Sequence, residues 1–564
     1  MRRTAACLAV LLPCLHVAPA AAGVRVLLAD TIHTGDPQQP TANALAWDTD
    51  DGRLLAVGER QAVLQRYPQA PRVDAGKATV VPGLIDAHAH LVGLGNTLAQ
   101  ADLSGARSRA EVVERLQAFE KTLAPGEWLL GAGWDQNRWD DTAFPTAADL
   151  DAAFPERPVY LERIDGHAGW ANGAALRIAE KKAGRSLSGD WQPDGGRILR
   201  DAAGKPAGVL VDAASALVSA HIPAPDAAVR EKRLHAALQL AVSNGLTGVH
   251  DMGVSRGDLA VMKRLADQGS LPLRIDAYAD GNNAALDDLC ANGLYTHPGG
   301  RLQMHGVKLF MDGALGSRGA ALLADYSDDP HNRGLLMTSP EEFEVAVRRA
   351  DGCKVQVATH AIGDRGNRIV LDTYEKVLGA HKDNDHRWRV EHAQVVALED
   401  IPRFARLGVI ASMQPTHATS DMGWAEQRVG PERIKGAYAW QRYLHSGARL
   451  ALGSDFPVEQ VDPRLGLYAA VTRQDRDGRP PGGWRPEQRL SPAEALRGFT
   501  SDAAYAGHDE ARVGRLRAGL HADFVVLDRD PLDAAAGRLD GLQVLSTWVD
   551  GEAVYTAAPP ASGG

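Results

Sequence analysis

The chain has 564 residues, of which 45% are hydrophobic and 23% charged, and its formal net charge at pH 7 is −10. This composition is typical of a soluble globular protein, and the length predicts one large domain with a smaller one. Because the Lys and Arg residues are scattered along the chain and form no basic cluster, we expect no nucleic-acid partner.

The N-terminus has the pattern of a secretory signal. Arg2 and Arg3 precede an apolar stretch over residues 5–15, and small residues follow at 18–22. The pattern predicts a cleaved signal over residues 1–22 and an exported, periplasmic protein. The apolar stretch is shorter than the roughly 20 residues of a spanning helix, so we expect no membrane span after cleavage. A lipoprotein anchored through Cys14 is the weaker alternative, because a proline precedes that cysteine.

Cysteines are few. Cys7 and Cys14 fall within the predicted signal, which leaves Cys290 and Cys353 in the mature chain. Two cysteines so far apart do not make a disulfide framework. A single bridge between them is compatible with the sequence but cannot be read from it. The fold is therefore expected to depend on its hydrophobic core.

Both ends of the chain carry short apolar runs separated by turn residues, a texture typical of β-strands. We predict strands at residues 24–28, 44–47, 53–58, 523–527, 544–549 and 552–555. Two strand-rich ends that flank a long α/β centre predict one small β-sandwich domain, built from residues 23–80 and 508–557.

The centre, residues 81–507, alternates short apolar strands with helical stretches, the pattern of a parallel sheet. The predicted strands lie at residues 80–87, 247–251, 274–279, 306–310, 355–359, 389–391, 409–413 and 449–452. Eight such units favour a closed (β/α)₈ barrel, in which the reactive residues lie at the carboxyl ends of the strands.

Residues from about 95 to 240 interrupt this alternation and carry five of the tryptophans, at positions 128, 134, 139, 170 and 191. One interpretation is an insertion that covers the barrel mouth, with Trp134 and Trp170 in contact with substrate. The other is a satellite subdomain with its own small core.

Four predicted barrel strands end in residues that bind metals. The stretch Pro82–His90 ends in His88 and His90, which point to the same side of a strand and can bind one metal. Later strands end in His360, His392 and Asp455. Each alone is compatible with a structural role, but together they indicate a metal site at one rim.

This order of histidines and aspartate resembles the amidohydrolase superfamily, in its amidohydrolase family 3 branch of N-substituted formamide deformylase-like hydrolases. The matching stretches are residues 82–90, 307–318, 359–364, 391–394 and 452–458. The resemblance implies a distorted (β/α)₈ TIM-type barrel with a β-sandwich built from both chain ends.

The resemblance also implies a metal site with one or two zinc ions. His88, His90 and Asp455 would hold one ion, His360 and His392 the other, and a carboxylated Lys308 would bridge them. A lysine ammonium cannot bind a cation, whereas a lysine carbamate is an anionic oxygen ligand. The alternative for Lys308 is an ion pair with Asp312 or Glu391.

The expected activity is hydrolysis of a carbon–nitrogen bond in a non-peptide amide of a small molecule. Asp455 would act as the catalytic residue that takes a proton from the attacking water and passes it to the leaving amine. An ester, carbamate or cyclic amide hydrolase stays open, because the same attack serves all of them. A non-catalytic metal-bearing binding protein is the remaining alternative, and a homo-oligomer is compatible with the sequence.

Three further residues are candidates for the site. His167 would bind substrate, or be a structural loop histidine. Arg318 would clamp a substrate carboxylate, or be a structural ion-pair partner. Asp251, at the end of a predicted strand, would support a ligand histidine from behind.

Overall fold

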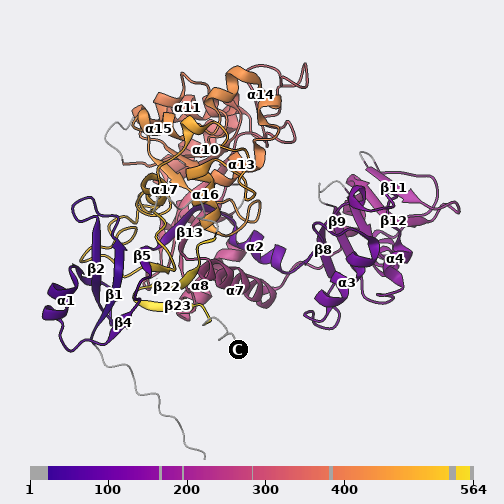
Figure 1. Cartoon of the computed structure of the whole chain (residues 1–564). Coiled ribbons are helices and arrows are strands. Elements are labelled where there is room, and N and C mark those ends of the chain that lie inside the picture. The colour runs from indigo at the N-terminus through magenta and orange to yellow at the C-terminus, as the bar shows by residue number, and fades with distance from the viewer. Residues whose placement is uncertain are drawn as a thin grey trace, which may run out of the picture.

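The computed structural model describes residues 23–163, 168–193, 196–281, 284–379, 385–532 and 541–558. Three sheets organise these residues into a composite end domain, a barrel and an insertion (Figure 1). The predicted signal over residues 1–22 lies outside the described residues. Within the described ranges, no helix has both the length and the apolar character needed to cross a membrane.

Strands from both chain ends form one sheet, as predicted. Its order is β23-β22-β21-β5-β1-β2-β3, with β4 paired to β1. The strands are β1 (Val24–His33), β2 (Thr41–Asp48), β3 (Leu54–Gly58), β4 (Arg72–Asp74), β5 (Thr79–Pro82), β21 (Phe524–Leu527), β22 (Val544–Val549) and β23 (Glu552–Thr556), and α1 (Arg60–Arg66) packs on β2. The N-terminal and C-terminal halves join where β5 pairs antiparallel with β21.

The sheet curls so that its two ends face each other. Trp47 in β2 lies with its ring centroid 5.8 Å from that of Trp548 in β22, although β21, β5 and β1 stand between these strands in the sheet order. Neighbouring strands are about 4.8 Å apart, so in a flat sheet the two strands would be far out of contact. The aromatic rings, with Phe524 stacked on Trp548 at 5.3 Å, therefore fill a sandwich-like interior.

Eight parallel strands form the barrel in chain order. They are β6 (Leu84–Ala89), β13 (Leu246–Val254), β14 (Arg274–Asp280), β16 (Leu302–Phe310), β17 (Gln356–Ala361), β18 (Arg389–His392), β19 (Ile410–Met413) and β20 (Leu450–Leu452), with the short β15 (Tyr295–Thr296) added to β16. The helices of this part are α2 (Leu91–Leu98), α7 (Ala227–Ser243), α8 (Arg256–Asp267), α9 (Ala284–Asn292), α10 (Pro340–Gly352), α11 (Asp364–Leu378), α12 (Ile401–Leu407), α13 (Pro415–Asp421), α14 (Ala425–Arg433), α15 (Trp440–His445), α16 (Pro463–Thr472), α17 (Pro492–Gly498) and α18 (Ser501–Ala506). All eight predicted strands are present.

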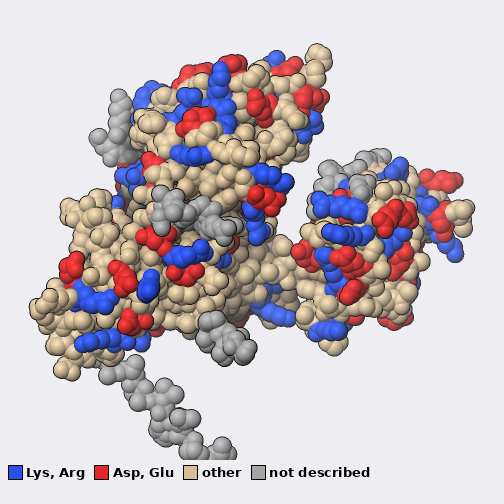
Figure 2. Space-filling model, in the orientation of Figure 1, with Lys and Arg blue, Asp and Glu red and all other residues tan. Residues whose placement is uncertain are grey.

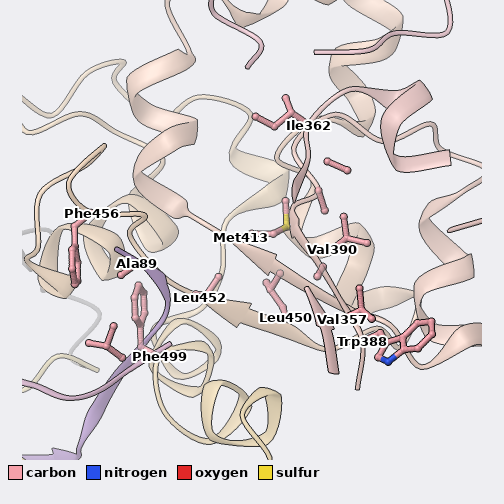
Figure 3. Packing of buried hydrophobic residues seen from close by; sticks show 14 of the residues in the cluster. Ala89, Val357, Ile362, Trp388, Val390, Met413, Leu450, Leu452, Phe456 and Phe499 are labelled. Atoms are coloured by element: carbon pink, nitrogen blue, oxygen red, sulfur yellow. The ribbon is translucent and has the colours of Figure 1, made fainter. Parts of the chain in front are cut away.

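Outward-facing strand residues pack against the helices. Figure 3 shows Val357, Val390 and Leu450 in this apolar layer, one each from β17, β18 and β20. Because strand side chains alternate, the neighbours of these residues point into the barrel. Several of these neighbours are polar: Gln356 precedes Val357, and Arg389 and Glu391 flank Val390. The large apolar core therefore lies outside the barrel wall.

The first predicted strand, residues 80–87, is in fact two strands that meet at Gly83. β5 belongs to the end sheet and β6 to the barrel. The Gly83 amide donates to the Asp523 carbonyl, and an added Cβ at Gly83 would lie 2.2 Å from Thr247 Oγ1. Only glycine fits this crossing, so the chain passes from one sheet into the other without a loop.

The barrel is closed between β20 and β6 by bonds from the loop after β20. The Asp455 amide donates to the His88 carbonyl at 2.7 Å, and the His90 amide donates to the Phe456 carbonyl at 2.9 Å. The Ser454 hydroxyl donates to Asp86 Oδ2 at 2.6 Å. This seam brings the histidines at the end of β6 next to Asp455.

Residues of the insertion form a separate six-stranded sheet, beside the barrel in Figure 1. Its elements are β7 (Ala101–Asp102), β8 (Leu129–Trp134), β9 (Val159–Arg163), β10 (Ala168–Ala171), β11 (Gly196–Arg200), β12 (Pro206–Asp212), α3 (Arg109–Glu120), α4 (Ala147–Asp151), α5 (Gly173–Ala183) and α6 (Ala216–Ser219). Two clusters of buried apolar residues lie on this sheet, distinct from the barrel core. The insertion is thus a satellite subdomain with its own core.

The tryptophans of the insertion fill this core. Trp134 and Trp170 are fully buried, 5.9 Å apart between ring centroids, and donate their Nε1 hydrogens to the carbonyls of Leu161 and Thr146. Neither ring has an exposed face. The burial argues against the substrate contacts expected for these residues from the sequence.

We expect Trp134→Ala and Trp170→Ala to lower the free energy of unfolding by about 3–5 kcal/mol, the range for truncating a buried aromatic ring. KM should stay unchanged in both variants. Urea unfolding and steady-state kinetics measure the two quantities, and Trp191→Ala, at a partly exposed position in the same subdomain, is the control. A raised KM with unchanged stability would instead show that the two rings contact the substrate.

Cys290 and Cys353 form a disulfide, with Cα atoms 5.0 Å apart. Cys290 lies in α9 and Cys353 is the C-terminal cap of α10. The bridge therefore joins two helices on the outside of the barrel.

Candidate metal centre

The six predicted ligands come together at the carboxyl ends of the barrel strands. His88 lies in β6 and His90 caps α2 directly after it. Lys308, His360 and His392 lie within the last three residues of β16, β17 and β18. Asp455 follows β20 in the seam described above. Strand periodicity thus delivers donors from five strands to one rim.

One compact group consists of His88, His90 and Asp455. Asp455 Oδ1 lies 3.4 Å from His88 Nε2 and 3.2 Å from His90 Nε2. Bonds of about 2.0–2.1 Å at tetrahedral angles place zinc ligands about 3.3 Å apart. The spacing of these three donors matches that value, so one metal fits between them.

His360 and His392 lie on the other side of His88. The ring centroids of His360 and His392 are 4.6 Å apart, and those of His88 and His392 are 4.9 Å apart. This crowding is possible only for neutral rings, because three imidazolium ions would repel one another. Burial, aided by the nearby Lys308, lowers the pKa of His88 to about 4 and that of His360 to about 3. Burial also lowers the pKa of His392.

Hydrogen bonds fix the orientation of three histidines. His88 Nδ1 donates to Glu391 Oε2 at 2.5 Å, His90 Nδ1 to the Met252 carbonyl at 2.8 Å, and His392 Nδ1 to Gln414 Oε1 at 2.8 Å. Each bond leaves Nε2 as the acceptor nitrogen facing the centre. An acceptor behind each ring is the usual support of a metal-binding histidine.

Beneath the histidines lies a buried network around Arg389. Arg389 bonds both oxygens of Glu391, at 2.7 and 3.0 Å, and also contacts His250 Nδ1 at 2.8 Å. Burial alone would raise the pKa of Glu391, but Arg389 and His88 lower it below the ordinary value. Glu391 therefore stays anionic and holds His88 in one tautomer.

Lys308 is buried, and its Nζ lies 3.2 Å from His88 Nε2. Asp312, one expected partner, instead accepts backbone bonds from Ala321, Ile362 and Gly363. Within the described residues, the ion pairs of Asp312 and Glu391 involve histidine or arginine and leave Lys308 out. Burial lowers the pKa of Lys308 to about 8, so its neutral fraction near neutral pH is larger than that of an exposed lysine.

Comparison with known proteins gives the family. The sequence pattern of the amidohydrolase family matches residues 72–555. The chain belongs to the amidohydrolase family.

Relatives of this amidohydrolase cover almost its whole length. Protein LONG AFTER FAR-RED 3 of Arabidopsis thaliana is 35% identical, over 93% of this chain and 90% of its own. N-substituted formamide deformylase of Arthrobacter pascens is 30% identical, over 93% and 97%. An uncharacterized metal-dependent hydrolase from Pyrococcus horikoshii superposes with a TM-score of 0.76 at 28% identity, over 91% and 99%. These findings make the chain a metal-dependent amidohydrolase.

The polar atoms of the site fit a bound divalent metal. His360 Nε2 is buried and lacks a hydrogen-bond partner among the described residues. A buried, unpaired imidazole nitrogen is unfavourable unless something binds to it. Neutral histidines and an ionised Asp455 form the donor set that zinc and its neighbours prefer. Burial would raise the pKa of Asp455, but His88 and His90 lower it well below the ordinary value.

Two of the predicted ligands have a left-handed backbone. The φ angle is 71° at His392 and 63° at Asp455. Residues other than glycine rarely adopt this conformation, which costs of order 1 kcal/mol or more. The surrounding seam and strand hold both residues in place, as expected for side chains that must face a common point.

The other candidates lie outside this cluster or beside it. Arg318 bonds both oxygens of Asp328, at 3.2 and 3.0 Å, which favours the structural ion pair over a substrate clamp. Asp251 accepts from the Leu91 amide at 2.9 Å, next to His90, and so supports the start of α2. His167 lies outside the described residues.

Sequence reasoning missed the groups that hold the ligands. A backbone carbonyl such as that of Met252 has no residue-type signature. Gln414 and His417 were detectable, because both closely follow the predicted strand 409–413, where barrel chemistry is expected. Glu391 was also detectable, since it is two residues from Arg389 on the same strand face.

Proposed function

We propose that this amidohydrolase hydrolyses a carbon–nitrogen bond in a non-peptide amide of a small molecule, and that it uses two zinc ions bridged by a carboxylated Lys308. The relative from Arthrobacter pascens, whose name describes removal of a formyl group from nitrogen, supports the bond type. The histidine-rich donor set supports zinc.

The observation that carries this proposal is the position of Asp455. Its Oδ1 faces His88 and His90 while its Oδ2 faces away from them, toward His417 at 3.8 Å. The low pKa of Asp455 keeps the carboxylate ionised at neutral pH. A carboxylate held at the metal rim and ready to accept a proton is what a water-attack mechanism requires.

When bound, a divalent metal supplies Lewis acidity, which makes water acidic enough to attack near neutral pH and polarises the substrate carbonyl. The chain's own groups do the rest. Asp455 takes the proton of the attacking water and later delivers it to the nitrogen of the departing amine. Glu391 and Gln414 hold the rings of His88 and His392 in their binding orientation.

Carboxylation of Lys308 needs a neutral amine. The Nζ lone pair attacks the carbon of CO₂, an N–C bond forms as one C–O π bond breaks, and the nitrogen releases a proton to solvent, which leaves a carbamate anion. The lowered pKa of Lys308 and its lack of a carboxylate partner among the described residues both favour this reaction. The product would carry two oxygens into a site lined by neutral imidazoles.

The test compares the purified, zinc-loaded protein on matched substrates. N-substituted formamides and N-acyl amines should be hydrolysed faster than esters, carbamates or cyclic amides of the same shape, and chelation should abolish turnover. Preference for the esters would overturn the amide assignment. Full metal content without turnover on the whole panel would favour the non-catalytic alternative.

Export to the periplasm is part of the proposal. The disulfide between Cys290 and Cys353 supports it, because such bridges persist in oxidising compartments. We expect the exported protein to begin near residue 23, and N-terminal sequencing that finds Met1 would contradict this.

A further inference from the structure

A seventh donor, His417, lies at the metal centre outside the family pattern described above. It is on α13, which begins two residues after β19. Its ring stacks on that of His392, with centroids 5.8 Å apart and planes inclined by 22°. One donor atom from each of His392, His417 and Asp455 lies within 4.8 Å of the other two.

The Nε2 atom of His417 is buried and has no hydrogen-bond partner among the described residues. Its nearest carboxylate oxygen, Asp455 Oδ2, is 3.8 Å away, beyond the roughly 2.7–3.2 Å of a hydrogen bond. His360 Nε2, an expected ligand atom, shows the same combination of burial and missing partner. A desolvated nitrogen of this kind is unfavourable unless a ligand binds it.

We propose that His417 is a ligand of the second metal ion, which it binds together with His392. This inference rests on the two-metal site of the proposed function. The two Asp455 oxygens divide between the two groups, Oδ1 toward His88 and His90 and Oδ2 toward His417. Oδ2 of Asp455 would then stay unbound beside His417 and keep its role as the proton acceptor.

The segment that carries His417 is built to place it. Gln414 orients His392 from the same turn, through its 2.8 Å bond to Nδ1. Pro415 starts α13, and the His417 amide donates to the Gln414 carbonyl. One tight turn after β19 therefore carries both Gln414, which orients His392, and His417 itself. A change in this turn would affect the second metal and leave the first in place.

The experiment titrates metal-free protein with Co²⁺ and Zn²⁺ and measures stoichiometry, affinity and the Co²⁺ absorption spectrum, without substrate. Wild-type protein should bind two equivalents. His417→Ala should bind the second equivalent at least about tenfold more weakly, since even a residue behind a ligand typically contributes 10–100-fold. His90→Ala should weaken the other site, and His445→Ala, at an exposed position in α15, should match wild type.

His417→Cys gives a test that a folding defect cannot imitate. A thiolate bound to Co²⁺ produces a sulfur-to-metal absorption band, and Cys290 and Cys353 are bridged and cannot supply it. We expect this band in His417→Cys at the second equivalent. Two equivalents of unchanged affinity in His417→Ala, or no such band in His417→Cys, would overturn the role of His417 alone. A single equivalent in the wild-type protein would overturn the two-metal site itself.

Discussion

Asp455→Asn is expected to lower kcat by roughly 10²–10⁴-fold, the range for loss of a general acid–base group. The amide has almost the shape of the carboxylate and retains an oxygen for the metal, but it cannot take up the proton of the attacking water. Metal content should stay at one equivalent or more, and circular dichroism should show a folded protein. Kinetics and metal analysis on the same preparation separate the two effects.

Asp372→Asn is a matched control, because Asp372 is an exposed residue of α11 that pairs with Arg403 at the surface. It should behave as the wild type does. Full activity in Asp455→Asn would remove the proton-transfer mechanism. Loss of all metal in that variant would instead show that Asp455 is required for metal binding, and another group would have to transfer the proton.

Lys308→Ala should lose bound metal and have no measurable turnover. The substitution removes the carbamate on β16, which is the anionic ligand proposed to lie between the two metals. The histidines that remain are neutral and bind two cations less well. A small added carboxylate such as propionate should restore part of the metal content and part of the activity, because it supplies the missing anion. Metal analysis with and without the carboxylate measures the effect.

Two comparisons sharpen this result. Lys376→Ala removes an exposed lysine that pairs with Glu344, and it should keep both metal and activity. Removal of CO₂ from the buffer before metal loading should reproduce the Lys308→Ala phenotype in the wild-type protein. Full metal and near-normal kcat in Lys308→Ala would exclude the carbamate bridge.

The positions of the barrel ligands could be predicted because they follow from periodicity. A short apolar run that ends in histidine or aspartate predicts a strand and places that last residue at the carboxyl-end rim of the barrel. His360, near the end of β17, is an example. Parallel strands then bring such ends together without further information. Six strands of the end sheet were also readable from turn residues and alternation, but β4 was not predicted and β5 was read as part of the first barrel strand.

The surroundings of the buried tryptophans and of Arg389 could not be predicted in the same way. Whether an apolar ring lines a pocket or fills a core depends on tertiary packing, so composition could not place Trp134 and Trp170. The sequence analysis made no prediction for the barrel interior, which is polar around Arg389 although branched apolar side chains usually fill such an interior. Here Arg389, central to that interior, is satisfied by partners from several different strands, and no local pattern in the sequence reveals such a network.

The crossing at Gly83 has a consequence for biosynthesis. β5 leads directly into β6 and His88, yet its partner strand β21 is near the other end of the chain. A ribosome therefore releases β5 and the histidines that follow it long before β21, the partner strand of β5, exists. The end domain cannot close while the chain is still being made. C-terminally truncated products would therefore expose the unpaired edge of β5 to proteases.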